Sequence, residues 1–554
     1  MMYAFKTIVL SLLPLAVATT SNGFDPREAT IASTHHSLDT GLTTCREVVS
    51  SFLSRIERLN NHTNAIISLN PHALSIADQQ DAQLRSNNGS YGPLFCIPIL
   101  LKDNYDTADI PTTGGNLALA QSQPSKDAPV VATLKKAGAI ILGKANLHEL
   151  ALEGLSVSSL GGQTINPYDS SRTPGGSSGG TGAAVASSFC VWGTGTDTVN
   201  SLRSPASANN LYSCRPTRGL ISRAGVVPIS YTQDALGPIA RSVEDVATAL
   251  TVMASVGFDA DDNTTALVPA GTYGTNYMSS LTKGSLKGLR LGLVEGFFNK
   301  TTSPENDPVN NAMAQTVAKL RKAGATIVPI TSSLYNSSAI LASLDTQRFE
   351  YRESMDAYLE RPSLGGQHPS TLNELYSGHD YLVIPSQYEY VNTSLVSSTA
   401  NTTGRQGSYA TVKQGVANLT LALAETFTAN GLDALIYPEQ TNIVVRVGSP
   451  SQSGRQGILA ALTGSPVVTI PVGFSNATAT APEGVPIGME ILGRPWTEEK
   501  LLQIAYQWQS LARVRKTPSW AKEVVPVKSY TAVPSITPNR GNIPAAYPVG
   551  TLGG

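Results

Sequence analysis

The sequence predicts an α/β protein in which helices flank a largely parallel or mixed central β-sheet. Three stretches carry this prediction, because each places a helical apolar pattern before a glycine and a short apolar strand directly after it. The glycines are Gly138, Gly324 and Gly431, and glycine is a common helix stop. Such alternation is typical of an α/β architecture, and we expect one large domain built on a mixed sheet.

The expected elements follow one another along the chain. Apolar positions at helical spacing predict helices over residues 48–59, 131–137, 309–320, 416–427 and 497–513. Short apolar runs predict buried strands over residues 94–101, 139–142, 326–330, 435–437, 467–472 and 487–492. Thr43 and Thr44 precede the first helix as candidate caps, and Thr497 precedes the last. Five prolines and no periodicity predict an extended or disordered tail over residues 525–554.

The amino terminus has the form of a secretory signal peptide. Lys6 precedes an apolar run over residues 7–17, and residues 16–18 (Ala-Val-Ala) match the small-x-small cleavage pattern. The run is shorter than the roughly 20 helical residues that span a bilayer, and an uncleaved membrane anchor is the alternative interpretation. We expect a signal peptide over residues 1–18, secretion, and no stable membrane association.

Secretion predicts N-glycosylation, and the chain contains nine acceptor motifs of the form Asn-x-Ser/Thr with no proline at x. They begin at Asn61, Asn88, Asn263, Asn299, Asn336, Asn392, Asn401, Asn418 and Asn476. The chain has four cysteines, Cys45, Cys96, Cys190 and Cys214. In an oxidising compartment they could form disulfides in three alternative pairings, or they could remain buried free thiols. No CxxC pair is present, so we expect no metal site of the zinc type.

The charge balance disfavours one class of partner. Lysine and arginine number 39 against 40 aspartates and glutamates, a net charge of −1, and the chain has no basic block. Since non-specific affinity for nucleic acid is mostly electrostatic, we expect no nucleic-acid binding. The sequence does not indicate an oligomeric state.

A glycine- and serine-rich segment interrupts the alternation. Residues 172–182 read RTPGGSSGGTG, which indicates a backbone in conformations that other residues resist. A flexible linker is one alternative, but the segment leads into an apolar stretch at 183–192 and is expected to be buried. A phosphate-binding loop would need a lysine that is absent. The Gly-x-Ser-x-Gly match of α/β-hydrolases at 175–179 would need a late histidine, and only His368 and His379 follow it.

Two further segments complete a pattern. Residues 195–207 read GTDTVNSLRSPAS around Ser201, and residues 92–107 read GPLFCIPILLKDNYDT with Lys102 at the end of an apolar strand. Lysines are seldom buried without a partner or a role, although a strand-end lysine that reaches solvent is the alternative. Together the three segments resemble the amidase signature family of serine hydrolases, and the similarity extends from about Asp25 to Trp520.

The resemblance implies the amidase signature fold over residues 24–524 and a serine–serine–lysine mechanism without a metal or organic cofactor. It implies Ser201 as the nucleophile, Ser177 as the proton-shuttling serine that follows a cis peptide bond, and Lys102 as the base. Burial disfavours the ammonium form of a lysine, which would allow Lys102 to accept a proton. An amide needs such help, because it is a poor electrophile with a poor leaving group.

The resemblance also implies an oxyanion hole and departs from the family pattern there. The implied backbone N–H donors lie over Thr198, Val199, Asn200 and Ser201, with Ser178, Asp197 and Arg203 as supports of the loop. The family has Gly-Gly where this chain has Val199-Asn200. If those glycines need positive φ, a valine fits badly. If they only let substrate approach, Val199 and Asn200 narrow or polarise the pocket, which is the outcome we expect.

Two functions from different classes follow. The first is a secreted amidase that hydrolyses a carboxylic amide to the acid and ammonia or an amine through an acyl-enzyme. The second is a catalytically impaired secreted binding protein on the same scaffold, and a conventional Ser–His–Asp hydrolase is a third interpretation. A small soluble amide is the expected partner, and the aromatic segments 349–359 and 376–390 are candidates for the pocket lining.

Overall fold

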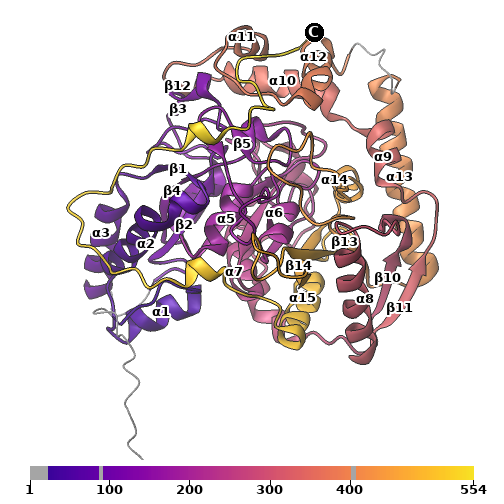
Figure 1. Cartoon of the computed structure of the whole chain (residues 1–554), viewed down its shortest axis with the longest axis horizontal. Coiled ribbons are helices and arrows are strands. Elements are labelled where there is room, and N and C mark those ends of the chain that lie inside the picture. Colours follow the sequence, from indigo (N-terminus) through magenta and orange to yellow (C-terminus); the bar gives the residue numbers. More distant parts are fainter. Residues whose placement is uncertain (1–22, 87–90, 401–406, 554) are drawn as a thin grey trace, which may run out of the picture.

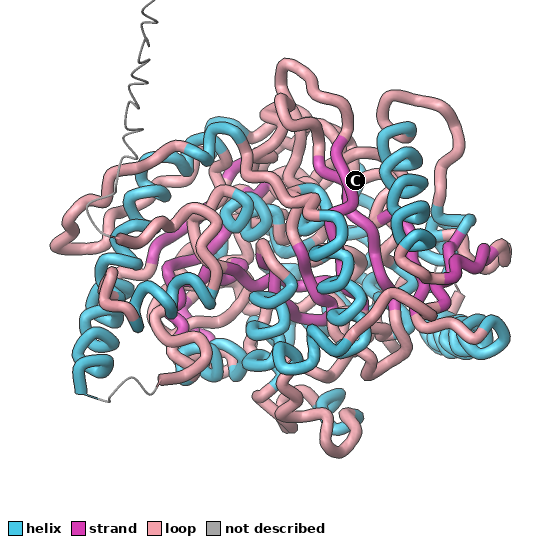
Figure 2. Tube along the Cα trace, turned by 90° about the horizontal axis from the view of Figure 1, so that it is seen from below, coloured by secondary structure: helices cyan, strands magenta, loops and turns pink. Residues whose placement is uncertain are grey.

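The computed structural model describes residues 23–86, 91–400 and 407–553. The predicted signal peptide and the acceptor motifs at Asn88 and Asn401 lie outside the described residues. Within the described part of the chain, helices on both sides cover a mixed sheet of eleven strands, which confirms the predicted fold class (Figure 1). In Figure 2 the strands run through the middle of the molecule between helices.

The sheet runs from the first strand at one edge to a pair of parallel strands at the other. In spatial order its strands are β1 (Ile66–Leu69), β4 (Ala139–Ala145), β2 (Ile97–Lys102), β7 (Trp192–Asp197), β9 (Ala235–Ala240), β8 (Tyr212–Arg215), β14 (Val467–Phe474), β15 (Pro486–Leu492), β13 (Ala434–Pro438), β10 (Arg290–Val294) and β11 (Thr326–Ile330). β2 is parallel to both β4 and β7, and β10 is parallel to β11 and β13. The other neighbouring pairs are antiparallel.

Two short antiparallel strand pairs and the helices complete the fold. The pairs are β3 (Gln123–Pro124) with β12 (Leu364–Gly365), and β5 (Val157–Ser158) with β6 (Gly162–Gln163). The α-helices are α1 (Ile31–Asp39), α2 (Cys45–Leu59), α3 (Ala73–Ser86), α4 (Pro129–Lys136), α5 (Gly179–Ala186), α6 (Arg203–Ala208), α7 (Val243–Ala254), α8 (Asp307–Lys322), α9 (Ser337–Leu344), α10 (Gln347–Leu359), α11 (Leu372–Ser377), α12 (Tyr388–Val396), α13 (Tyr409–Asn430), α14 (Ile458–Thr463) and α15 (Glu498–Ala512). No helix in the described ranges is both long and apolar enough to cross a bilayer.

The predicted helix–glycine–strand units are confirmed. Gly138, Gly324 and Gly431 follow α4, α8 and α13 with φ of 97°, 95° and 57°, a region that favours glycine. The strand predicted to start at residue 94 starts instead at Ile97, because Cys96 has a φ of 60° and turns the chain.

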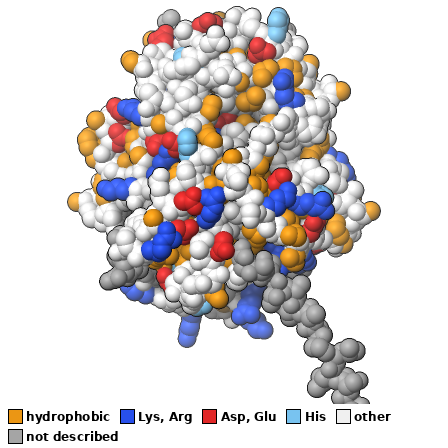
Figure 3. Space-filling model, turned by 90° about the vertical axis from the view of Figure 1, so that its left-hand side faces the viewer, with side chains coloured by type: hydrophobic (Ala, Val, Ile, Leu, Met, Phe, Trp, Pro, Cys, Tyr) orange, Lys and Arg blue, Asp and Glu red, His pale blue; other side chains and the backbone are white. Residues whose placement is uncertain are grey.

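Beyond α15 the chain follows the surface. From residue 525 to 553 it passes α2, where the Lys528 N–H donates to Ser54 Oγ at 3.0 Å, and ends beside α12 (Figure 1). Its last part is joined to the body by a β-bridge between Val549 and Leu382. On the molecular face drawn in Figure 3, acidic and basic side chains are interspersed.

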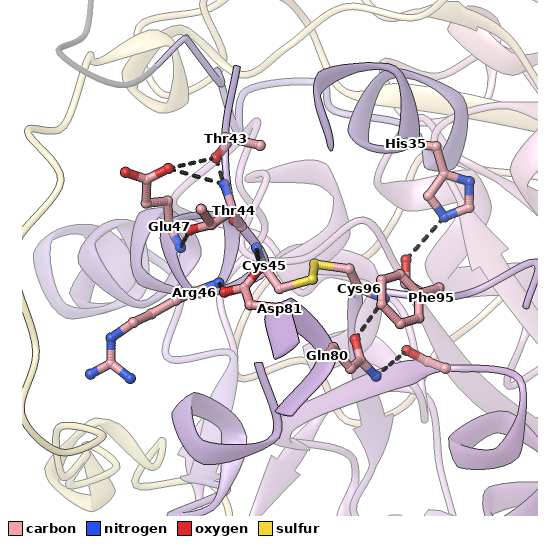
Figure 4. Close-up of a disulfide and its surroundings, with 11 residues drawn as sticks. His35, Thr43, Thr44, Cys45, Arg46, Glu47, Gln80, Asp81, Phe95 and Cys96 are labelled. Carbon is pink, nitrogen blue, oxygen red and sulfur yellow. Dashed lines mark hydrogen bonds between the residues drawn. A yellow bond between two sulfur atoms is a disulfide. The ribbon is translucent and has the colours of Figure 1, made fainter. Parts of the chain in front are cut away.

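One disulfide ties α2 to the strand that carries Lys102. Cys45, the first residue of α2, pairs with Cys96 just before β2, with their Cα atoms 5.4 Å apart (Figure 4). The backbone N–H of Cys45 donates to Asp81 Oδ1 at 2.7 Å, so this helix end is also held by a carboxylate. Cys190 and Cys214 are buried free thiols.

This pairing predicts a thiol count. Burial raises the pKa of Cys190 to about 12 and that of Cys214 well above its usual value, so neither thiol should react in the native protein. We expect two reactive thiols in denaturant without reductant and four after reduction. Four thiols before reduction, measured with a thiol reagent on secreted protein, would contradict the pairing.

Candidate active site

The three motif segments meet at one edge of the sheet. β2 ends at Lys102 and its parallel neighbour β7 ends at Asp197, so their carboxyl ends lie side by side. In α/β sheets, ligands bind outside the carboxyl ends of such strands. The glycine-rich segment reaches the same edge, because Ser177 lies just before the buried helix α5.

Lys102 and Ser177 are in direct contact. Lys102 Nζ donates to Ser177 Oγ at 2.6 Å and to Thr196 Oγ1 at 2.7 Å, and both Lys102 and Ser177 are fully buried. Thr196 Oγ1 also accepts from Asn104 Nδ2 at 3.1 Å. The Gly176–Ser177 peptide bond is cis. The lysine therefore has two hydroxyl partners, Ser177 from the glycine-rich segment and Thr196 from β7.

The environment of Lys102 favours its neutral form. Burial lowers the pKa of Lys102 to about 7, although the charges of Asp197 and Asp234 act in the opposite direction. No carboxylate among the described residues lies within ion-pair distance of the Lys102 amine. A lysine with such a pKa can accept a proton near neutral pH.

Ser201 lies in the loop between β7 and α6. Ser201 is 7% exposed, whereas Lys102 and Ser177 are fully buried, so Ser201 is the most exposed residue of the three. The loop is held to the glycine-rich segment by the Ser178 N–H, which donates to the carbonyl oxygen of Ser201 at 3.1 Å. The Ser178 hydroxyl also contacts the backbone N–H and carbonyl oxygen of Thr196.

The same loop presents unused backbone donors. The N–H groups of Val199, Asn200 and Ser201 donate to no described residue, whereas the next N–H, of Leu202, donates to Asp197 Oδ2 at 3.1 Å. Buried backbone N–H groups are normally paired, so three successive free donors are available to a ligand. An oxyanion hole uses backbone donors of this kind.

Asp197 holds this loop through two buried arginines. Arg203 donates to both Asp197 carboxylate oxygens at 3.0 Å, and Arg215 Nη1 donates to Oδ1 at 2.7 Å. Burial would raise the pKa of Asp197, but the two guanidinium groups hold it at about 2. Arg203 also donates to the carbonyl oxygen of Val199 and to Glu490 Oε2, so it links the loop to β15.

The structure decides between the two interpretations of Val199-Asn200. Neither residue has positive φ, so the loop needs no glycine for its backbone conformation. Val199 is partly buried against an apolar cluster that includes Ile458 and Leu462. Asn200 is fully buried, and its Nδ2 donates to Glu439 Oε1 at 3.0 Å. Compared with two glycines, Val199 and Asn200 therefore add side chains that pack against the protein interior, and Val199 also lines a pocket.

Two pockets adjoin the loop. One, of about 180 Å³, contacts Thr198 and is mostly apolar, with Val226, Val227, Ile229 and Leu236 in its lining. The other, of about 340 Å³, contacts Val199 and is more polar, with Asn299, Asn336, Arg455 and Gln456 in its lining. Residues of the aromatic segments 349–359 and 376–390 line neither of these two pockets. Several of them belong to a hydrophobic cluster that also contains Val227 and Ile229 of the apolar pocket, so their part in a substrate pocket stays a prediction.

The histidines of the sequence patterns lie elsewhere. His379 is exposed and bonds to the carbonyl oxygen of Gly550, and His368 bonds to that of its neighbour Pro369. Sequence reasoning did not predict that His148 lies beside Ser177. His148 follows β4, and its backbone N–H donates to the carbonyl oxygen of Ser177 at 3.0 Å. Because β4 is the parallel neighbour of β2, a residue just beyond its end could have been predicted to lie near Lys102. Burial lowers the pKa of His148 to about 3, so its ring is neutral.

The sequence matches the family described as Amidase over residues 47–502. A probable amidase of Arabidopsis thaliana is 30% identical over 531 residues, which cover 93% of this chain and 96% of that protein. One glutamyl-tRNA(Gln) amidotransferase subunit, from a Sulfurihydrogenibium species, is 31% identical over 487 residues, covering 84% and 93% of the two chains. The X-ray structure of native peptide amidase from Stenotrophomonas maltophilia is similar with a TM-score of 0.74 at 31% identity, over 89% of this chain and 98% of that chain.

The fold and these relatives define the class, which is that of amide-hydrolysing enzymes. The chain belongs to the Amidase family, as its sequence motifs predict.

Proposed function

We propose that this protein is a secreted serine amidase in which Ser201 is the nucleophile, Ser177 the proton relay and Lys102 the base. Ser177 gives its proton to neutral Lys102 and takes the proton of Ser201 as Ser201 Oγ attacks the amide carbonyl. The developing oxyanion accepts hydrogen bonds from the free N–H groups of the loop at 199–201. Ser177 then protonates the leaving nitrogen, and water hydrolyses the acyl-enzyme by the same proton path.

The observation that carries this proposal is the buried contact between Lys102 and Ser177. A buried lysine costs stability unless it is paired, and this one has hydroxyl partners in place of a carboxylate. A secreted binding protein, the other candidate, has no use for such an arrangement. The free N–H groups beside Ser201 also favour the enzyme.

A panel of amides tests the proposal. Purified secreted protein is incubated with aliphatic, aromatic and peptide amides, and released ammonia or amine is measured, with Ser201→Ala as the matched control. We expect hydrolysis of at least one small soluble amide by the wild type and none by the variant. Equal release by both proteins would assign the activity to another group.

The rate of hydrolysis should depend on pH through Lys102. Because only its neutral form accepts a proton, and its pKa is about 7, we expect kcat/KM to rise with pH through that value. The measurement is the pH profile of kcat/KM on the best amide of the panel. A profile that is flat from about pH 5.5 to about pH 8 would show that no such base titrates.

The secretory part of the proposal predicts where glycans lie. Of the seven acceptor asparagines that the structure describes, six are exposed, namely Asn61, Asn263, Asn299, Asn336, Asn418 and Asn476. Asn392 is half-buried and its Nδ2 donates to the carbonyl oxygen of Gly553 at 2.7 Å, so we expect it to remain unmodified. Enzymatic glycan removal followed by peptide mapping should mark exposed asparagines as aspartates and show a new amino terminus after Ala18. An unglycosylated protein that retains residues 1–18 would contradict secretion.

A further inference from the structure

A buried carboxyl group contacts the oxyanion loop from behind. Glu439 follows β13 directly, is fully buried, and accepts the Asn200 Nδ2 hydrogen bond at 3.0 Å. Its own backbone is fixed, because the Glu439 N–H donates to the carbonyl oxygen of Gly488 at 3.1 Å. Asn200 is one of the two residues that replace the family's glycines, so this contact belongs to the part of the loop in which the chain departs from the family pattern.

The contact leaves two buried oxygen atoms without a partner among the described residues, namely Asn200 Oδ1 and Glu439 Oε2. Both are acceptors if the carboxyl is ionised, so they cannot satisfy each other. If the carboxyl holds a proton on Oε2, that O–H can donate to Oδ1 while Nδ2 donates to Oε1. The acid and the amide are then fully complementary, and no buried polar atom of the pair is left unpaired.

The charged groups around Glu439 come from three other elements. Glu490 on β15 and Asp197 on β7 favour the protonated carboxyl, whereas Arg203 on α6 and the Asn200 hydrogen bond favour the ionised form. The Arg203 side-chain donors are directed to Asp197, Glu490 and backbone carbonyl oxygens, and none donates to Glu439. Tyr437, on β13 opposite Glu490, is buried and neutral. Burial is the largest influence and raises the pKa of Glu439 to about 8.

The loop is closely packed around Asn200. A Cβ on Gly457 would lie 2.2 Å from the carbonyl oxygen of Val199 and 2.5 Å from Cβ of Asn200, so Gly457 packs directly against both residues. Gly457 on one side and the hydrogen bond to Glu439 on the other both constrain the Asn200 side chain. Asn200 itself carries one of the unpaired N–H groups, and its neighbour Ser201 carries another.

We propose that Glu439, in its protonated form, is a positioning residue that holds Asn200 as an acid–amide pair and so keeps the oxyanion donors of the loop aligned. The inference rests on the proposed function of that loop. Ionisation of Glu439 removes the donor to Asn200 Oδ1 and sets two acceptors against each other. The enzyme therefore loses activity on the alkaline side as Glu439 titrates, above the rise that Lys102 produces.

The test uses a fluorophosphonate, so it needs no knowledge of the substrate. Ser201 Oγ displaces fluoride from phosphorus, its proton passes to Ser177 and Lys102, and the phosphoryl oxygen occupies the oxyanion hole. The rate of Ser201 labelling is measured from about pH 6 to about pH 10 for the wild type and Glu439→Gln. Glutamine keeps both hydrogen bonds to Asn200 and cannot ionise, so we expect similar labelling at neutral pH and an alkaline decline near pH 8 in the wild type alone.

Three further variants separate positioning from folding. Glu439→Leu removes both hydrogen bonds and should slow labelling about ten- to a hundredfold at every pH, with the circular dichroism spectrum unchanged. Asn200→Gly removes the group through which Glu439 acts, so it should abolish the alkaline decline. Glu498→Gln is the control: Glu498 is a buried carboxyl that accepts the Thr217 N–H at 2.7 Å away from the loop, and the variant should keep the decline.

A parallel alkaline decline in the wild type and Glu439→Gln, or its persistence in Asn200→Gly, would overturn the positioning role while Ser201 labelling still supports the amidase. No labelling of Ser201 in folded wild-type protein would overturn the proposed function, and the positioning role with it.

Discussion

Replacing Lys102 with alanine is expected to lower kcat for amide hydrolysis by about 10⁴-fold or more while the protein stays folded. In the proposed mechanism Lys102 is the base. Its amine contacts the Ser177 hydroxyl at 2.6 Å, and alanine leaves that hydroxyl without a group that can take its proton. Lys102 has hydroxyl partners and no carboxylate partner, so its removal breaks no ion pair, and we expect the variant to fold. The measurement is kcat on the best amide, with circular dichroism to establish folding.

Two histidine variants are the matched controls for this result. His368→Ala and His379→Ala should keep wild-type activity, because neither ring contacts the loop or the glycine-rich segment. A conventional Ser–His–Asp hydrolase would reverse the pattern, with an essential histidine and a dispensable lysine. Activity in Lys102→Ala close to that of the wild type would therefore refute the lysine mechanism.

Replacing Asp197 with alanine is expected to destabilise the protein by about 3–5 kcal/mol. Asp197, Arg203 and Arg215 are fully buried, and removing the carboxylate leaves two guanidinium groups without their shared counter-charge. The Leu202 N–H and the loop before it lose their anchor as well. The measurement is the denaturant midpoint, which should fall while the slope of the unfolding transition stays unchanged.

An exposed ion pair is the control for Asp197. Glu295 pairs with Lys300 at 2.9 Å, but its side chain is 30% exposed and that of Lys300 is 74% exposed, so Glu295→Ala should lower the free energy of unfolding by less than about 1 kcal/mol.

The stabilisation that Asp197 provides depends on pH in a definite direction. Because the folded-state pKa of Asp197 is about 2, below its ordinary 3.8, the stabilisation is present above pH 4 and is lost as the pH falls through about 2. Equal effects of the two substitutions would contradict a central role for Asp197.

The fold could be predicted from sequence where local pattern and tertiary structure agree. The units that end at Gly138, Gly324 and Gly431 carry their own helix stop, so each was readable without knowing its neighbours. β7 and β9 were not predicted. β7, with the sequence WGTGTD, has no apolar run, and it is a strand because it pairs with β2 and β9 at the centre of the sheet.

The residues of the site likewise divide into those that local sequence predicts and those that only the fold brings together. Motifs predict Lys102, Ser177 and Ser201 as site residues because each lies in a short segment with a recognisable order of residues. Glu439 could not be found in this way, since it contacts Asn200 across 239 residues of sequence and belongs to no motif. Cys96 is a similar case, because only the fold shows that it adopts left-handed backbone geometry and reaches Cys45.

The most direct test of the triad is to map the fluorophosphonate adduct on purified secreted protein by mass spectrometry, with Lys102→Ala treated in parallel. Such a probe reacts with an activated serine and leaves a covalent mark on it. We predict a single adduct on Ser201 in the wild type and none in Lys102→Ala. An adduct on another serine, labelling that survives in Lys102→Ala, or no adduct on folded wild-type protein would contradict the proposed triad.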